Sequence, residues 1–471
     1  MTLTSTIKST SGPAGVPETS RSRIALELSE TFKLSVPIAL TQLGQIAMMT
    51  TDLALIGRLG DQAVAAAALA HTVFFISFTI GMGLVSAVAP LAAQAVGARN
   101  PRMVRRALRV GLWAALLIAL PLMALPFFGE QILTMLGQAP DNARLAQRYL
   151  LGLTVGIVPA LWFMAIRNFM GAVNRPEPGL WITLAAIPAN GLLGYALIHG
   201  QWGLPKLELF GAGIATTIVN VCMCAAALWF CYSQRPFRKF HVLGRFWRID
   251  WALMRKLFAV GAPISLAFLL EYGLFGAAAL LMGTISTTAL AAHQVALQIT
   301  AILFMIPFGI GMAATVRVGQ AAGRRDAAAV SRAGFVAVAL GMAILLALTL
   351  AVVLARYPIA ELFFGDAAQS SRVTVELTAT LLLVGATFFI ADGIQTIAAG
   401  SLRGLNDTRV PLLLCAFSYW GIGFTASWGL AFWAGFGAVG VWAGLACGTA
   451  VYSVLLILRF RSFARRLEFA A

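Results

Sequence analysis

The chain has 471 residues, of which 60% are hydrophobic and only 11% are charged, and its formal net charge is +16 at pH 7. Average soluble proteins carry about 25% charged residues, so this composition excludes a water-soluble protein. Apolar stretches of about 20 residues, the length of a helix that crosses a bilayer, recur throughout the chain. The sequence therefore predicts an all-α polytopic membrane protein.

Apolar stretches bounded by charged residues, Pro and Gly predict twelve transmembrane helices. Residues 1–33 contain no apolar stretch, so the first span, rather than a cleaved signal peptide, is expected to direct insertion. In chain order the spans are expected at 34–56, 63–94, 107–128, 145–170, 179–199, 209–233, 257–283, 288–316, 333–355, 375–402, 410–434 and 437–458.

The two halves of the chain repeat each other. Gln94–Asn100 resembles Gln320–Asp326, and Phe210–Ala212 resembles Phe436–Ala438 at the same offset of 226 residues. Twofold repeats are typical of alternating-access carriers that bind substrate between two lobes. A channel or an enzyme with two halves of shared ancestry could show the same repeat. We expect a cytoplasmic N-terminal tail (1–33), an N-terminal six-helix lobe (34–233), a basic cytoplasmic linker (234–256), a C-terminal six-helix lobe (257–458) and a cytoplasmic C-terminal tail (459–471).

The basic residues are distributed unevenly between the two sides of the predicted spans. If the N-terminus is cytoplasmic, 28 of the 34 Lys and Arg residues fall on cytoplasmic segments. Because cytoplasmic loops are enriched in Lys and Arg, this bias predicts that both termini are cytoplasmic and supports an even number of spans. The net charge therefore reflects membrane topology, and no nucleic-acid partner is expected.

Motifs of other functional classes are absent or lie in the wrong context. The sequence contains no phosphate-binding loop, so transport energy is expected from an ion gradient rather than from nucleotide hydrolysis. Gly435–Gly440 matches G-x-G-x-x-G but opens a membrane helix with no preceding strand, which favours helix packing over dinucleotide binding. The cysteines have neither the spacing of a zinc site nor that of a disulfide framework. We therefore expect no enzymatic activity, no catalytic residue and no resident cofactor.

Three acidic residues lie well inside predicted spans: Asp52 in the first, Glu271 in the seventh and Asp392 in the tenth. An ionisable group at such a position costs several kcal/mol unless it faces water, a cation or a partner. These acids are therefore the candidate cation-coupling residues. For any one of them the alternative is a neutral carboxylic acid that hydrogen-bonds a neighbouring helix.

Aromatic, amide and thioether side chains share a helical face with each acid. Aromatic rings attract organic cations, carboxylates neutralise them and methionine adapts to varied shapes, so this combination favours lipophilic cationic substrates. The predicted substrate cavity includes Gln42, Gln45 and Met49 beside Asp52, Phe268, Tyr272 and Phe275 beside Glu271, and Phe388, Gln395 and Thr396 beside Asp392.

Several motifs resemble those of the multidrug and toxic compound extrusion (MATE) transporters, most closely the bacterial NorM-type branch. The resemblance covers nearly the whole chain apart from the N-terminal tail. It rests on the segments Thr51–Gly57, Glu271–Phe275, Ala291–Gln298, Val316–Gln320, Ala391–Gly393 and Ala398–Gly404.

This resemblance implies two six-helix lobes around a V-shaped central cavity, and export of lipophilic or cationic compounds in exchange for sodium ions or protons. It implies that Glu271 and Asp392 form the cation site of the C-terminal lobe, with sodium as a candidate metal, and that Asp52 forms the acidic site of the N-terminal lobe. It adds Asn190 and Gln294 to the cavity. It also implies drug resistance, small-molecule cationic or amphipathic substrates, and a multi-pass monomer in the bacterial inner membrane.

Two departures from the family pattern remove oxygen atoms, which leaves sodium and protons open as the coupling ion. Ala186 stands where relatives often have a second Asn, and Phe388 replaces an aromatic hydroxyl one turn before the C-terminal acid. Other functions also stay open. A lipid or glycolipid flippase of the same superfamily should line its cavity with Arg to bind phosphate, a channel would conduct without counter-transport, and an exporter could serve one endogenous metabolite.

Overall fold

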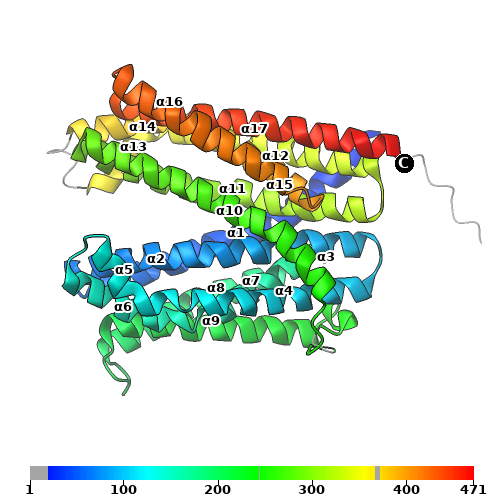
Figure 1. Ribbon diagram of the computed structural model, residues 1–471, viewed down its shortest axis with the longest axis horizontal. Helices are drawn as coiled ribbons and strands as arrows, with labels where there is room; N and C mark the ends of the chain where they lie inside the picture. Colours follow the sequence, from blue (N-terminus) through cyan, green and yellow to red (C-terminus); the bar gives the residue numbers. More distant parts are fainter. Residues whose placement is uncertain (1–19, 243, 245, 366–371, 471) are drawn as a thin grey trace, which may run out of the picture.

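The protein is seen here as a computed structural model that describes residues 20–242, 244, 246–365 and 372–470 (Figure 1). Every regular element within these residues is helical, which confirms the all-α prediction. The N-terminal half contains α1 (Ser20–Gly57), α2 (Asp61–Ser86), α3 (Val88–Gly97), α4 (Pro101–Leu122), η1 (Leu125–Phe128), α5 (Gly129–Met135), α6 (Pro140–Thr154), α7 (Ile157–Ala172), α8 (Glu177–His199), α9 (Glu208–Ser233) and η2 (Phe237–Phe240). The C-terminal half contains α10 (Trp251–Ile285), α11 (Thr287–Gly323), α12 (Ala327–Leu354), α13 (Arg356–Phe364), α14 (Arg372–Gly404), α15 (Arg409–Cys415), η4 (Ala416–Phe424), α16 (Thr425–Trp428), η5 (Gly429–Trp433) and α17 (Gly437–Ala470).

Most of the predicted spans correspond to helices that are long and apolar enough to cross a membrane. Within the described residues ten helical segments meet this description, and α6 with α7, bent by 49° at their junction, makes an eleventh. The remaining predicted span, 34–56, lies in α1, which is 38 residues long but is not among them. Gln42, Gln45 and Asp52 lower the hydropathy of the predicted span within α1. The chain is thus a multi-pass membrane protein.

The helices form two bundles, one in the lower half and one in the upper half of Figure 1. The lower bundle contains α2 to α9, and the upper one contains α11 to α17. Helix α10 runs from the upper bundle towards α2 and α4 of the lower one, with which it is in contact. Each bundle has its own apolar core, built largely from Ala, Leu and Val. This arrangement places a lobe of helices on each side of a central interface.

The first part of α1 reaches across the interface. Its later part packs on α8 of the N-terminal bundle, whereas α1 also contacts α11 and α12 of the C-terminal bundle. Glu27 forms a bidentate ion pair with Arg317 of α11, at distances of 2.8 and 2.9 Å. Residues 20–33, which belong to the predicted tail, form the first turns of α1. Through Glu27 this part of the helix is bonded to the other bundle.

The structural repeat follows the sequence repeat but differs in where helices are broken. The N-terminal copy breaks one span between α2 and α3 and another between α6 and α7, whereas the C-terminal copy has the continuous helices α11 and α14. Conversely, α8 is a regular helix, and its counterpart contains the π-helical stretches η4 and η5. π-Helical segments are uncommon and occur frequently at functional sites.

Two glutamines join the bundles through reciprocal hydrogen bonds at one end of the interface. Gln94 of α3 donates to the carbonyl oxygen of Gly404 at 2.8 Å and accepts from Asn406 at 2.8 Å. Gln320 of α11 donates to the carbonyl oxygen of Ala172 at 2.9 Å and also bonds Asn174. We call these contacts the glutamine clasp. Each bundle contributes one glutamine and one turn that hydrogen-bonds the glutamine of the other bundle, so the clasp has the pseudo-twofold symmetry of the repeat.

Close backbone contact accompanies the clasp. A Cβ atom added to Gly97 would lie 2.1 Å from the carbonyl oxygen of Gln320, and one added to Gly323 would lie 2.1 Å from that of Gln94. Such distances are far below van der Waals contact, so only glycine permits this approach. Further side-chain hydrogen bonds across the interface join Glu27 to Arg317 and Ser265 to the Ile80 carbonyl.

The segment between the two lobes docks on the N-terminal bundle. Asp250 caps α10 by accepting from the Leu253 backbone N–H, and it also forms an ion pair with Arg106 of α4. Burial raises the pKa of Asp250, but the hydrogen bonds from Arg106 and Leu253 outweigh it and lower the pKa below its ordinary value. Its carboxylate therefore stays ionised and paired at neutral and mildly acidic pH.

Substituting Gly97 or Gly323 by Ala is expected to separate the two lobes at the clasp, because the new methyl group would collide with a backbone carbonyl that cannot rotate away. Spin labels at the exposed positions Arg102 and Arg325, in a background without the native cysteines, should report longer distances in both variants. Gly276→Ala is the control, because its Cβ would meet nothing within 4 Å. Distance distributions identical to those of the parent protein would show that this contact does not hold the lobes together.

Candidate functional site

The acid of the N-terminal bundle is held by two neutral donors. Asp52 is only 8% exposed. It accepts hydrogen bonds from the side-chain amide of Asn190 on α8 and from the hydroxyl of Thr216 on α9, the latter at 3.1 Å. The amide oxygen of Asn190 is buried without a hydrogen-bond partner. The carboxylate of Asp52 and the unpartnered amide oxygen of Asn190 are oxygen atoms of the kind that a hard cation prefers.

The two acids of the C-terminal bundle share one bridging amide. The side-chain N–H group of Gln395 lies 3.2 Å from a carboxylate oxygen of Glu271 and 3.2 Å from one of Asp392. Thr396 bonds the Asp392 backbone carbonyl at 2.9 Å. The hydroxyl of Tyr419, which lies in η4, donates to Glu271 at 3.4 Å. The structure thus brings Glu271, Asp392, Gln395 and Thr396 together.

None of the three acids forms an ion pair with a described basic side chain. Their hydrogen-bond partners are amides and hydroxyls, which stabilise a carboxylate but do not neutralise it. An ionised carboxylate in low dielectric is costly unless a cation or a proton compensates it. Each lobe therefore contains at least one buried carboxyl group whose ionised form lacks a directly bonded positive partner among the described residues.

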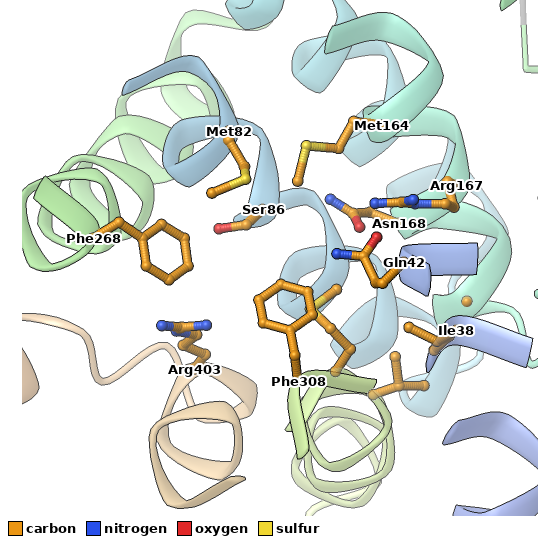
Figure 2. Close-up of a pocket in the computed structure, with 13 residues that line it drawn as sticks. Ile38, Gln42, Met82, Ser86, Met164, Arg167, Asn168, Phe268, Phe308 and Arg403 are labelled. Carbon is orange, nitrogen blue, oxygen red and sulfur yellow. The ribbon is translucent and has the colours of Figure 1, made fainter. Parts of the chain in front are cut away.

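A cavity lies between the two bundles, lined by residues of α1, α2, α7, α10, α11 and α14 (Figure 2). Its polar side chains are Gln42, Ser86, Arg167, Asn168 and Arg403, and its larger apolar ones include Met82, Met164, Phe268, Phe308 and Met312. Of the predicted cavity residues, it contains Gln42 and Phe268. Asp52, Glu271 and Asp392 do not line it, because they lie within the bundles rather than at this part of the interface.

Three other predicted residues form contacts inside their own bundle or across the interface. Phe388 is 1% exposed and packs edge-on against Phe275 and Trp442, so it belongs to the core of the C-terminal bundle. Tyr272 packs against Phe75 of α2 with ring centroids 4.8 Å apart and the rings tilted by 39°, which places it at the interface between the bundles.

The remaining predicted residues differ in exposure. Asn190 is fully buried beside Asp52, and Gln45 is half-buried. Met49 and Gln294 are exposed on the surface of their helices, and no side-chain hydrogen bond of Gln294 occurs among the described residues.

Several residues at these sites escaped the sequence analysis. Thr216 and Tyr419 bond the acids from other helices, and a single hydroxyl inside an apolar stretch gave no periodic pattern to mark it. Tyr419 supplies an aromatic hydroxyl next to Glu271, although Phe388 lacks one. Arg167 and Arg403 are two of the 28 basic residues that the sequence assigns to cytoplasmic segments, whereas their side chains face the cavity between the bundles.

Comparison with known proteins identifies the family. The MatE family model matches residues 37–196 and 263–428, one segment in each half of the chain. The chain belongs to the MATE family. A probable multidrug resistance protein NorM of Bradyrhizobium diazoefficiens is 63% identical over 468 residues, which cover 99% of this chain and 100% of that protein. A multidrug resistance protein NorM of Burkholderia vietnamiensis is 37% identical, with 92% of this chain and 93% of that protein covered.

Solved structures confirm the MATE fold. The crystal structure of the eukaryotic MATE transporter AtDTX14 superposes with a TM-score of 0.83 at 20% identity, covering 94% of this chain and 98% of that one. A MATE crystal structure in the bent conformation gives a TM-score of 0.85 at 18% identity, covering 95% and 98%. The predicted fold class and family are therefore both confirmed, and a transporter rather than an enzyme is established.

Replacing Gln395 by Met is expected to lower the thermal unfolding midpoint of the purified protein. The substitution removes the one amide that bonds both Glu271 and Asp392, and hydrogen bonds to charged groups contribute about 1.5–3 kcal/mol. Thr380→Val, on the exposed side of α14, removes a hydroxyl that bonds only its own helix and serves as the control. An unfolding midpoint equal to that of the control would show that the bridge contributes nothing to stability.

Proposed function

We propose that this MATE-family protein is a secondary active multidrug efflux antiporter that exports lipophilic or cationic small molecules in exchange for sodium ions or protons. The observation that carries the proposal is the presence of carboxylates inside membrane helices of both lobes, held only by neutral donors among the described residues. The two relatives named as multidrug resistance proteins support the same function.

The coupling step follows from the shared environment of Glu271 and Asp392. Two carboxylates joined by one amide in low dielectric cannot both stay ionised without a positive partner. The pair therefore holds either the coupling cation or the positive charge of a drug, and binding of one releases the other. Asp52 with Asn190 provides the corresponding acidic site in the N-terminal lobe.

The coupling ion is proposed to be sodium, with the proton as the tested alternative. The oxygen atoms of Glu271, Asp392, Thr396 and Tyr419 are the ligands that a hard cation prefers, whereas a proton needs only one carboxyl group. One monovalent cation that moves inward gains about 2.3 kcal/mol per 100 mV of membrane potential. Exchange for one singly charged drug cancels this electrical gain, so the concentration gradient of the cation then drives export.

The glutamine clasp supports alternating access. It joins the lobes at one end of the interface. The hydrogen bonds of Gln94 and Gln320 therefore have to break before a rocking motion of the lobes can open that end. Occupancy of the carboxylate sites would select between the clasped and the unclasped arrangement. The lobes that move are residues 34–233 and 257–458.

The orientation proposed for the protein places both termini and the glutamine clasp on the cytoplasmic side of the bacterial inner membrane. The excess of Lys and Arg on the corresponding segments supports it. In this orientation the protein is clasped on the inside, and the segment 234–256 is a cytoplasmic linker. We propose that one chain is the transporting unit, because each carboxylate site is complete within it.

Glu271→Gln and Asp392→Asn are each expected to reduce ethidium transport in proteoliposomes at least tenfold, because each removes a charge that exchanges cation for drug. Transport by the parent protein should accelerate under an imposed sodium gradient at fixed pH. Glu376→Gln, an exposed position of the same helix α14, should transport normally. Full activity of both core variants would remove the proposed site, and a response to a pH gradient alone would assign the coupling to protons.

A green fluorescent protein fused to the C-terminus is expected to fluoresce in cells, and alkaline phosphatase fused there is expected to be inactive, since both report a cytoplasmic location. The same pair of reporters inserted after Gly137, in the segment that follows α5, should give the opposite result. An active phosphatase at the C-terminus would reverse the proposed orientation.

A further inference from the structure

A cavity of about 650 Å³ lies where α9 ends and the chain turns back into the segment that joins the two lobes. One wall comes from the last turns of α9 and includes Trp229 and Tyr232. The other wall comes from η2 and the residues that follow it and includes Arg238 and His241. We call this space the linker cavity. It is separate from the carboxylate sites and from the glutamine clasp, and the antiport cycle described above gives it no role.

The wall formed by the linker is anchored to the N-terminal bundle. Phe237 is 2% exposed and packs against Phe169 of α7 with ring centroids 6.1 Å apart. Phe240 packs edge-on against the same ring. Further along, the backbone carbonyl of Phe246 accepts a hydrogen bond from the indole N–H of Trp113 on α4 at 2.9 Å. These contacts hold the segment on the bundle and fix one wall of the cavity.

Positive charge gathers at this cavity without acidic neighbours along the chain. Residues 234–249 contain five Lys and Arg residues and no Asp or Glu. Arg238 and Lys239 are exposed and take part in none of the ion pairs of the described residues. Asp250, the next acid along the chain, is paired with Arg106. Clusters of basic residues next to a membrane helix attract anionic lipids, and basic pockets at this level bind their head groups.

The outer face of α9 leads from the membrane interior to the linker cavity. This helix is long and apolar enough to span a membrane, and it packs on α6, α7 and α8 of its own bundle, away from the C-terminal bundle (Figure 1). Five exposed side chains recur at intervals of three or four residues and so lie along one face of the helix. They are Ile218, Val221, Ala225, Trp229 and Tyr232. Trp and Tyr are enriched at the boundary between hydrocarbon and water, so this apolar stripe ends at the membrane surface, where the cavity begins.

We propose that the linker cavity binds the head group of an anionic phospholipid, whose acyl chains lie along the exposed stripe of α9. The phosphate lies against Arg238, because a guanidinium group binds phosphate through paired hydrogen bonds. The chains cover Trp229 and the apolar residues before it. A soluble anion would use the charged cavity alone, whereas a phospholipid uses both the cavity and the stripe that leads to it. Since η2 belongs to the segment that joins the lobes, the bound lipid holds this connection against the N-terminal lobe.

Native mass spectrometry of the protein, released from nanodiscs with equal amounts of phosphatidylglycerol and phosphatidylcholine, tests the site without an ion gradient or a drug, so its outcome is independent of antiport. The parent protein should retain phosphatidylglycerol at least tenfold over phosphatidylcholine. Arg238→Gln should reduce the retained phosphatidylglycerol at least tenfold and leave phosphatidylcholine unchanged, because it removes a charge and paired hydrogen bonds. Arg248→Gln, an exposed position of the same segment outside the cavity lining, is the matched control. It should reduce retention at most about fivefold, the effect of one basic residue near a membrane surface.

A second arm separates a lipid from a free phosphate ester. Millimolar sn-glycerol 3-phosphate should leave the retained phosphatidylglycerol unchanged, because it lacks the acyl chains that contact α9. Displacement by this compound would assign the cavity to a soluble phosphate ester and overturn the lipid proposal. A smaller preference for phosphatidylglycerol in the parent protein would overturn it even if the variants fail to fold. Equal losses in Arg238→Gln and Arg248→Gln would show that net charge alone attracts the lipid, which would also overturn it.

Discussion

A carboxylate inside a membrane helix requires compensation, and this electrostatic constraint determines how both lobes of the protein are built. Water is excluded and the effective dielectric is low, so an ionised acid needs hydrogen-bond donors and a positive partner. Asn190 and Thr216 donate to Asp52 from two neighbouring helices. Gln395 donates to Asp392 on its own helix and to Glu271 on α10. None of these donors carries a charge, and Arg403 acts on Glu271 only at a distance, so a directly bound positive partner is left to an ion or a substrate.

The interface between the lobes converts such occupancy into movement. Packed cores keep each bundle rigid, and α3 and α10 pack across the interface between the bundles, where hydrogen bonds and glycine contacts near Gln94 and Gln320 fix one arrangement. Hydrogen bonds of this kind contribute about 1 kcal/mol each, so the clasp is strong enough to favour one arrangement and weak enough for ion binding to reverse it. The helical extension of α1 that bonds Arg317 adds a further tie across the same interface.

The sequence predicted the features that follow from unusual residue types inside spans or from the spacing of residues along one helix. Asp52, Glu271 and Asp392 stood out because acids are rare inside spans, and Gln395 followed because it is one turn from Asp392 on the same helix. The repeat at Gln94 and Gln320 was also visible, but its meaning was not, since reciprocal contacts between lobes require knowledge of the packing. Tyr419 and Thr216 reach the acids from distant helices, and no spacing along one helix predicts that.

Phe388 and Arg403 illustrate a second limit. Both lie on the helix of Asp392, and helical spacing alone does not say which neighbour a face meets. The structure packs Phe388 into the core against Trp442 and directs Arg403 into the cavity beside Phe268. A count of basic residues on loops also treats an arginine one turn inside a helix as a loop charge, although its long side chain can turn inwards.

Competition between a drug cation and the coupling ion on the purified protein tests the central claim most directly. Binding of the lipophilic cation tetraphenylphosphonium would be titrated at rising sodium concentration and fixed ionic strength, and at falling pH without sodium. The account predicts that the apparent Kd of tetraphenylphosphonium rises linearly with the concentration of one of the two cations, and that Asp392→Asn abolishes this effect. An apparent Kd that neither sodium nor protons change would contradict exchange at a shared carboxylate site.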